Sequence, residues 1–205
     1  AQLENPASEA YVAALAEAHQ RYLDRALAFD AGQLTGSARI SRDIFVRERR
    51  LAIEGLRFPA RLLPIDQMDS LATTIAVFGS GASAQPFRDA RDYDNFLARA
   101  DRFTVWVDTA IGAMREGIRA GVTQPRAVIV KVVPQLRDIA RDDPEQTPFW
   151  QAIRALPETM PAAERAAIEA RWRVAIRERV VPAYRRLADF IEREYVPAAR
   201  ESVGW

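Results

Sequence analysis

The sequence predicts an all-α protein, an elongated helical array organised on one long, proline-kinked amphipathic helix. Two observations predict this class. Apolar residues recur every three or four positions through most of the 205 residues, as they do in amphipathic helices. One such run extends from position 161 to position 200 and carries a wide apolar stripe, which consists of Ile168, Trp172, Ile176, Val180, Tyr184, Leu187, Ile191 and Tyr195.

The long helix has a predicted start and a predicted irregularity. Pro161 suits a first helical position, where its missing N–H has no intrahelical partner to lose. Pro182 lies inside the stripe and removes one backbone hydrogen bond, so we expect a kink without a break. A straight helix of this length is about 60 Å long, whereas a compact chain of this size is about 43 Å across. We therefore expect either an elongated molecule or a stripe that packs against something outside this chain.

Three helices separated by loops are predicted before the middle of the chain. The first spans residues 5–29, because Asn5-Pro6 is a good helix start and helical periodicity follows it. The third spans residues 66–77 and precedes a loop rich in glycine and serine at 79–85. The second spans residues 41–55, and its inward-facing residues are expected to be Ile44, Phe45, Leu51 and Ile53.

The rest of the chain continues in the same way. A helix is predicted over residues 91–119, and Gly121 is well placed to cap it. Residues 126–141 contain a β-branched run that is also compatible with a strand, but their apolar spacing favours a helix. Pro134 lies inside this segment and should kink or split it. A short helix at 149–156 precedes the long one. Residues 1–205 are most simply one domain.

Composition excludes several classes of protein and site. With a net charge of +1, bulk charge does not indicate a nucleic-acid or anionic-membrane partner. The chain has no cysteine, which excludes disulfides, thiolate metal sites and cysteine nucleophiles. No apolar run approaches the roughly 20 residues of a membrane span. The chain opens at Ala1 without an initiator methionine, which suggests a processed, periplasmic or secreted protein, or one end of a longer chain.

Few residues suggest catalytic or metal-binding chemistry. His19 is the only histidine, and neither a zinc-binding H-E-x-x-H motif nor a G-x-S-x-G elbow is present. The glycines at 79–83 lack the lysine of a phosphate-binding P-loop, so they are interpreted as a linker. Tyr184 and Tyr195 each place a hydroxyl at the edge of the apolar stripe. They could be hydrogen-bond donors in a cleft or core residues with a polar edge. No catalytic residue, metal ligand or cofactor is predicted in this chain.

Three segments together resemble a known family. They are residues 92–99, residues 114–126, and residues 181–204. Their order and spacing are similar to the amino-terminal half of the bacterial domain-of-unknown-function family 885. The resemblance implies a long, mainly helical protein of zinc-metallopeptidase type, whose metal site lies in an H-E-x-x-P-G-H motif of the carboxy-terminal half. That motif is absent here, so zinc is implied for the full-length family and none of its ligands for this chain.

The resemblance also suggests roles for three arginines. Arg115 and Arg119 lie four positions apart and could bind a peptide carboxylate through bidentate pairs, or could form a solvated helix face. Arg200 could be a cleft residue or part of the last exposed turn. The candidate substrate-binding residues are therefore Arg115, Arg119, Tyr184, Tyr195 and Arg200.

Two functional hypotheses follow. In the first, the chain is the helical scaffold and cleft wall of a zinc-dependent, peptidase-like hydrolase, and it is inactive without the metal-binding half. It would then pair with that half, or self-associate through an exposed apolar face. In the second, it is a self-contained helical module that binds a partner helix or an apolar molecule along the stripe at Trp172 and Tyr184. The first hypothesis expects an open stripe and the second expects closed surfaces, with Trp205 in a finished core.

Overall fold

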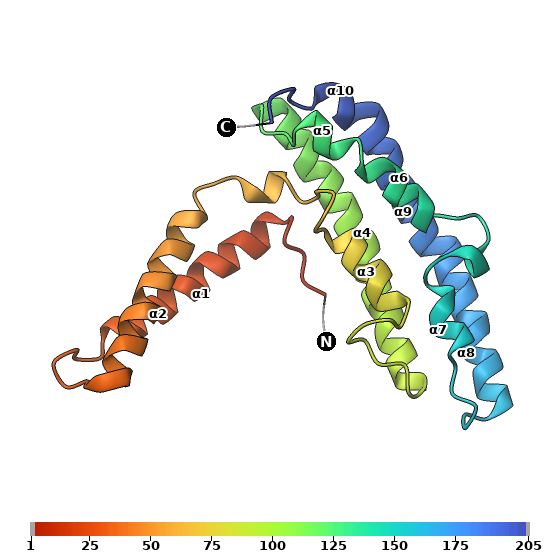
Figure 1. Ribbon diagram of the computed structural model, residues 1–205, viewed down its shortest axis with the longest axis horizontal. Helices are drawn as coiled ribbons and strands as arrows, with labels where there is room; N and C mark the ends of the chain where they lie inside the picture. The colour runs from red at the N-terminus through yellow and green to blue at the C-terminus, as the bar shows by residue number, and fades with distance from the viewer. Residues whose placement is uncertain (1–2, 204–205) are drawn as a thin grey trace. The chain divides into compact units, whose positions relative to one another are not determined.

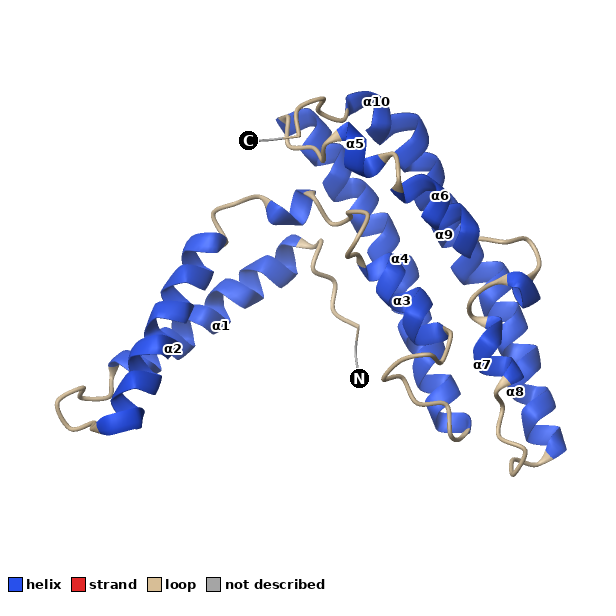
Figure 2. Ribbon diagram, viewed as in Figure 1, coloured by secondary structure: helices blue, strands red, loops and turns tan. Residues whose placement is uncertain are grey.

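The computed structural model describes residues 3–203, and these residues form helices and loops without any strand (Figure 2). The all-α prediction is therefore confirmed. The chain divides into two compact units. One is a helical hairpin at Pro6–Arg61, and the larger one begins at Leu62 and includes residues 3–5.

The hairpin unit contains α1 (Glu9–Leu27) and α2 (Gly36–Gly55), and a short 3₁₀ turn at Ala60–Leu62 spans the sequence boundary between the two units. The side chain of Ser8 caps α1 by accepting the N–H of Tyr11 at 3.2 Å. Helix α2 begins five residues before its predicted start at Ser41. The buried residues between the two helices are few, namely Leu23, Ala26 and Val46, with Ile53 packed beside them.

The predicted inward face of α2 is mostly wrong. Ile44, Phe45 and Leu51 are 57%, 41% and 49% exposed, and only Ile53 faces the hairpin seam. Helix α2 carries apolar residues on more than one side, and periodicity does not say which side the neighbouring helix will cover. The structure places the seam along Val46 and Ile53.

The larger unit contains the remaining helices (Figure 1). Their bounds are α3 (Leu71–Gly79), α4 (Ala90–Ala120), α5 (Arg126–Ile129), α6 (Val132–Ile139) and α7 (Trp150–Arg154), with a 3₁₀ turn at Pro144–Gln146. Helix α3 starts after its N-cap Ser70, later than predicted. The predicted split near Pro134 is confirmed, because α5 ends before this proline. Pro134 lies in the first turn of α6, where a missing N–H costs little.

The long helix runs without a break for 37 residues. It comprises α8 (Ala162–Ala175), a π-turn at Ile176–Val180, α9 (Val181–Phe190), a second π-turn at Ile191–Tyr195, and α10 (Val196–Ala198). Each π-turn directly precedes a proline at the second position of the next segment. In the wider turns the N–H of Val181 bonds to Ile176 and that of Val196 to Ile191. The helix thus passes both prolines by widening locally.

All eight predicted stripe residues are buried within the chain itself. Trp172 stacks on Phe96 at 5.0 Å between ring centroids, and its indole N–H donates to the carbonyl of Phe149 at 3.2 Å. Phe103 packs against Tyr184 at 4.8 Å. The expectation of an open stripe is therefore wrong, because α4 and α6 pack along it and Tyr184 bonds to Ala72 of α3. Trp172 and Tyr184 have no exposed surface for the apolar ligand of the second hypothesis. Trp205 lies outside the described residues.

Candidate functional site

A ladder of ion pairs joins α4 to the long helix, and the two run side by side in the same direction (Figure 1). Its four rungs are Asp94–Arg171 at 3.2 Å, Asp101–Arg179, Asp108–Arg186 at 3.1 Å, and Arg115–Glu194 at 2.6 Å. Most of these side chains are about half exposed. Each pair alone contributes little stability in water, but the series defines which side chains lie opposite one another.

The spacing of the rungs explains the two π-turns. The members on α4 follow one another at intervals of seven residues, whereas their partners follow at intervals of eight, seven and eight. A π-turn accommodates one extra residue in the same length of helix. Each interval of eight contains most of a π-turn. The extra residue of each turn is thereby absorbed, and the partners on the long helix stay opposite the seven-residue repeat of α4. The fourth rung also reverses polarity, with its arginine on α4.

A hollow of about 440 Å³ lies at the last two rungs and is the candidate functional site. Arg115 forms a bidentate pair with Glu194 there, with Nε–Oε2 and Nη2–Oε1 distances of 2.8 and 2.6 Å. Its guanidinium also lies 5.2 Å from the ring centroid of Phe190. The hollow is lined by Asp108, Ile111, Arg115, Arg186, Asp189, Phe190, Arg193 and Glu194.

The charges in this hollow are balanced but not all are paired. The hydrogen bond from Arg115 lowers the pKa of Glu194, and the same bond raises the pKa of Arg115. Asp189 forms an ion pair at 2.8 Å with Arg137, which does not line the hollow. Of the three lining arginines, Arg193 alone forms no ion pair within residues 3–203. An incoming carboxylate would therefore find a vacant guanidinium beside one that already holds a carboxylate.

The two predicted tyrosines lie in the core and not in this hollow. The hydroxyl of Tyr184 donates to the carbonyl of Ala72 at 2.6 Å, and burial raises the pKa of this phenol well above its usual value. The hydroxyl of Tyr195 accepts the N–H of Gln124 at 2.8 Å. Burial also raises the pKa of Tyr195, with the bond from Gln124 opposing this shift. Both hydroxyls therefore anchor neighbouring backbone.

The remaining predicted arginines are also apart from the hollow. Arg119 is exposed in the last turn of α4. Arg200 joins the end of the long helix to the loop after α4, because its backbone N–H and its Nε both bond to Thr123 at 3.1 Å. Of the five candidate residues, only Arg115 lines the hollow. Its partner Glu194 is 79 residues away in the sequence, and nothing in the local pattern marks this pair.

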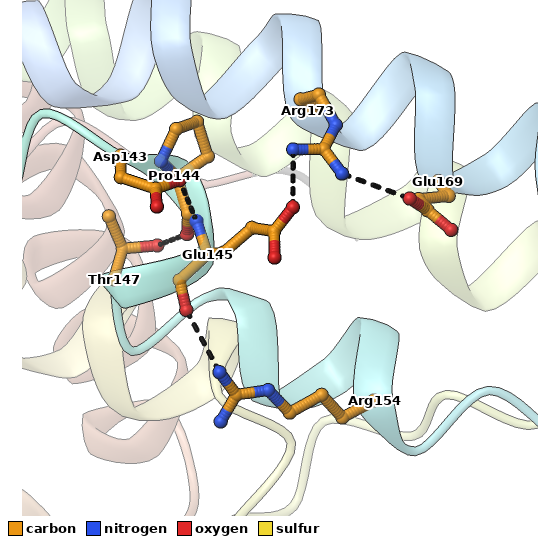
Figure 3. A network of polar contacts seen from close by, with 7 residues as sticks. All are labelled: Asp143, Pro144, Glu145, Thr147, Arg154, Glu169 and Arg173. Carbon is orange, nitrogen blue, oxygen red and sulfur yellow. Dashed lines mark hydrogen bonds and ion pairs between the residues drawn. The ribbon is translucent and has the colours of Figure 1, made fainter.

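A second hollow, of about 630 Å³, lies beside the 3₁₀ turn at Pro144–Gln146. Next to it, Arg173 of α8 bridges the carboxylates of Glu145 and Glu169 at 2.7 and 3.0 Å, and Arg154 donates to the carbonyl of Glu145 (Figure 3). The guanidinium of Arg173 also lies 4.4 Å from the ring centroid of Trp150. These contacts fasten the turn to the long helix, so we assign them a structural role.

A comparison with known protein families identifies the family of this chain. The model of the family described as "Bacterial protein of unknown function (DUF885)" matches residues 1–204. The chain belongs to the DUF885 family. No match was found among curated proteins.

The described part of this DUF885 chain does not fit a zinc ion. Among residues 3–203 no group of three or more histidine, cysteine, aspartate or glutamate side chains is placed to hold a metal. The single histidine, His19, has its Nδ1 at 3.0 Å from a guanidinium nitrogen of Arg49, and a cationic neighbour opposes metal binding. None of the helices between residues 3 and 203 combines the length and apolar character that crossing a bilayer requires.

Proposed function

We propose that this chain is the helical scaffold and substrate-cleft portion of a zinc-dependent, peptidase-like hydrolase, and that protein outside the 205 residues supplies the zinc ligands. Membership in the DUF885 family over residues 1–204 is one support. The other is the resemblance of residues 92–99, 114–126 and 181–204 to that family's amino-terminal half, and the peptidase-like activity rests on this resemblance. Since the described residues do not fit the metal, we derive no catalytic step from them. Their proposed role is to hold and orient a peptide.

Within this proposal the hollow at Arg115 binds a substrate carboxylate. The Arg115–Glu194 pair is about half exposed, and exposed pairs of this kind are worth about 1 kcal/mol or less. A peptide carboxylate offers the same two oxygen atoms, so it can replace Glu194 at Arg115 at little cost. Arg193 adds a positive charge that forms no ion pair with a carboxylate among residues 3–203. The apolar wall at Ile111 and Phe190 would contact the adjoining part of the peptide.

The product of the complete reading frame provides the test. We expect it to hydrolyse peptides, and we expect Arg115→Gln to raise KM for peptides with a free carboxylate by about tenfold or more with kcat little changed, as for a lost charged hydrogen bond. Arg179→Gln is the matched control, since it breaks another rung of the same ladder outside the hollow. Equal effects of the two variants, or no peptide hydrolysis at all, would exclude the proposed role.

One observation favours a second candidate, a self-contained helical binding module. The stripe of the long helix is closed by the chain's own helices, so the larger unit has a complete core along it, and such a module would bind its partner on a surface other than this stripe. Such a module would have no zinc and no hydrolytic activity even as the complete reading-frame product. The same assay therefore distinguishes the two candidates.

A further inference from the structure

Helix α2 carries an apolar stripe on the side away from its own hairpin seam. Ile40, Ile44 and Leu51 are 62%, 57% and 49% exposed, and Arg47 is the exposed fourth member of the series. The intervals of four, three and four residues are those of the a and d positions of a coiled coil. Val46 and Ile53, which face α1, project more than 100° away around the helix. Helix α2 therefore has one covered and one uncovered apolar face.

Because the hairpin has a small core, the exposure of a second apolar face lowers its stability. Val46 is the only buried residue of α2, and Leu23 and Ala26 are the only ones of α1. Isolated short helices are marginal in water and depend on packing of their apolar faces. A hollow of about 370 Å³, to which Leu27, Val46 and Leu51 contribute apolar walls, borders the stripe. The stripe and the hollow together form one continuous apolar surface on which another helix can pack.

The charged residues that flank the stripe determine which helix can pack on this surface. Asp43 and Arg50 flank the stripe one heptad apart on the same side, at g positions, while Glu48 lies on the other side at an e position. Two copies of α2 in antiparallel order place Asp43 of each opposite Arg50 of the other. Parallel order would instead stack Arg47 on Arg47 and bring Asp43 beside Glu48. Only the antiparallel pair is complementary.

The available area suits a modest dimer. Four half-exposed side chains (Leu27, Ile40, Ile44 and Leu51) supply the apolar part of this surface. The aliphatic stems of Arg47 and Arg50 extend this surface toward the roughly 800 Å² per partner of a standard interface. Asp43 is 56% exposed and paired only with its neighbour Arg42, and Arg47 and Arg50 form no ion pair within residues 3–203.

We infer that α2 is a homodimerisation helix: a second copy of this chain docks its own α2 antiparallel along Ile40, Ile44, Arg47 and Leu51, with two symmetry-related Asp43–Arg50 ion pairs. Ile40 then faces Leu51 of the other copy, and the stem of Arg47 covers Ile44. A closed two-fold pair of this kind uses the same patch twice. This inference is independent of the proposed hydrolase function.

Sedimentation velocity on the 205-residue chain from 1 to 200 μM tests it. We expect a monomer–dimer equilibrium with a micromolar dissociation constant. Ile44→Glu should abolish the dimer, whereas Val105→Glu, at a position 61% exposed on α4, should not. Circular dichroism checks that each variant keeps its helix content.

Charge exchange gives a second test that does not depend on the apolar residues. Asp43→Arg alone and Arg50→Asp alone should each weaken the dimer at least severalfold, and the doubly exchanged chain should recover it because the pair is restored in reverse. A wild-type chain that is monomeric at 200 μM overturns the inference, as does a double exchange without recovery. Monomeric protein that instead sediments with phosphatidylglycerol vesicles would make α2 a membrane-surface helix and would equally overturn it.

Discussion

Deleting Arg177 should shorten the long helix by one residue without changing which side chains face α4. Arg177 is an exposed residue of the first π-turn, where its guanidinium pairs only with the adjacent Glu178. Removal of one residue lets the π-turn close to a regular α-helical turn. The interval between Arg171 and Arg179 then becomes seven, the same as that between their partners on α4.

The cost of this deletion comes mainly from Pro182. A proline inside a regular helix costs about 3 kcal/mol, because its ring meets the carbonyl four residues earlier. The π-turn relieves that contact at present, so we expect a loss of about 3 kcal/mol in the free energy of unfolding. Pro182→Ala in the shortened chain should recover most of it.

Deleting Arg185 is the control, since it too removes one arginine from outside the core but from the regular segment α9, together with the bonds of that arginine to Ala140 and Asp142. Here the remaining helix must rotate by about 100° against α4. Five buried side chains then leave the core, namely Leu187, Ala188, Phe190, Ile191 and Tyr195. Large buried side chains cost about 2–5 kcal/mol each when their packing is lost, which exceeds the whole stability of a typical domain.

Urea unfolding followed by circular dichroism and tryptophan fluorescence measures both deletions. The chain without Arg177 should unfold cooperatively at a lower midpoint, and the chain without Arg185 should show no cooperative transition. Equal damage from the two deletions would refute the role of the π-turn as a register-keeping insertion.

Two further predictions concern α4 and its last rung. Gly117→Ala should destabilise the protein by about 1–3 kcal/mol, because the added Cβ would lie 2.5 Å from the carbonyl oxygen of Val122. Gly112→Ala, which has open space around it, should be neutral or stabilise the protein by up to about 1 kcal/mol. The urea unfolding midpoints of the two variants compare these effects. Since the pKa of Glu194 is lowered, its pairing stabilises the fold above the ordinary carboxyl value of 4.5 and is lost as pH falls through the folded-state pKa. Carboxyl-carbon NMR should show a midpoint below 4.5 that Arg115→Gln returns upward; an unchanged midpoint would contradict the pairing.

Periodicity could predict those helices that have a single apolar face packed against the rest of the chain. The stripe of the long helix and the span of α4 follow from residues three and four apart, and the left-handed cap at Gly121 follows from the needs of a helix end. Helix α2 could not be oriented in this way, because Val46 and Ile44 belong to two different apolar faces. Choosing between them requires knowing where the neighbouring helix lies.

The π-turns had a local signal that periodicity does not detect. The sequence Ile-x-x-x-Val-Val-Pro-Ala at 176–183 recurs as Ile-x-x-x-Tyr-Val-Pro-Ala at 191–198, fifteen residues later. This interval equals two heptads and one extra residue, so the repeat itself indicates an insertion beside each proline. The candidate hollow had no such signal. Its central pair, Arg115 with Glu194, depends on the parallel packing of two helices that the sequence separates by more than 40 residues.

The zinc content of the purified 205-residue chain tests the central functional claim most directly, namely that this chain is scaffold and cleft wall and not the carrier of the metal. After incubation with equimolar zinc and gel filtration, elemental analysis should find far less than one zinc per chain, with no difference between the wild type and His19→Ala. One tightly held zinc per chain, lost in His19→Ala, would contradict the claim.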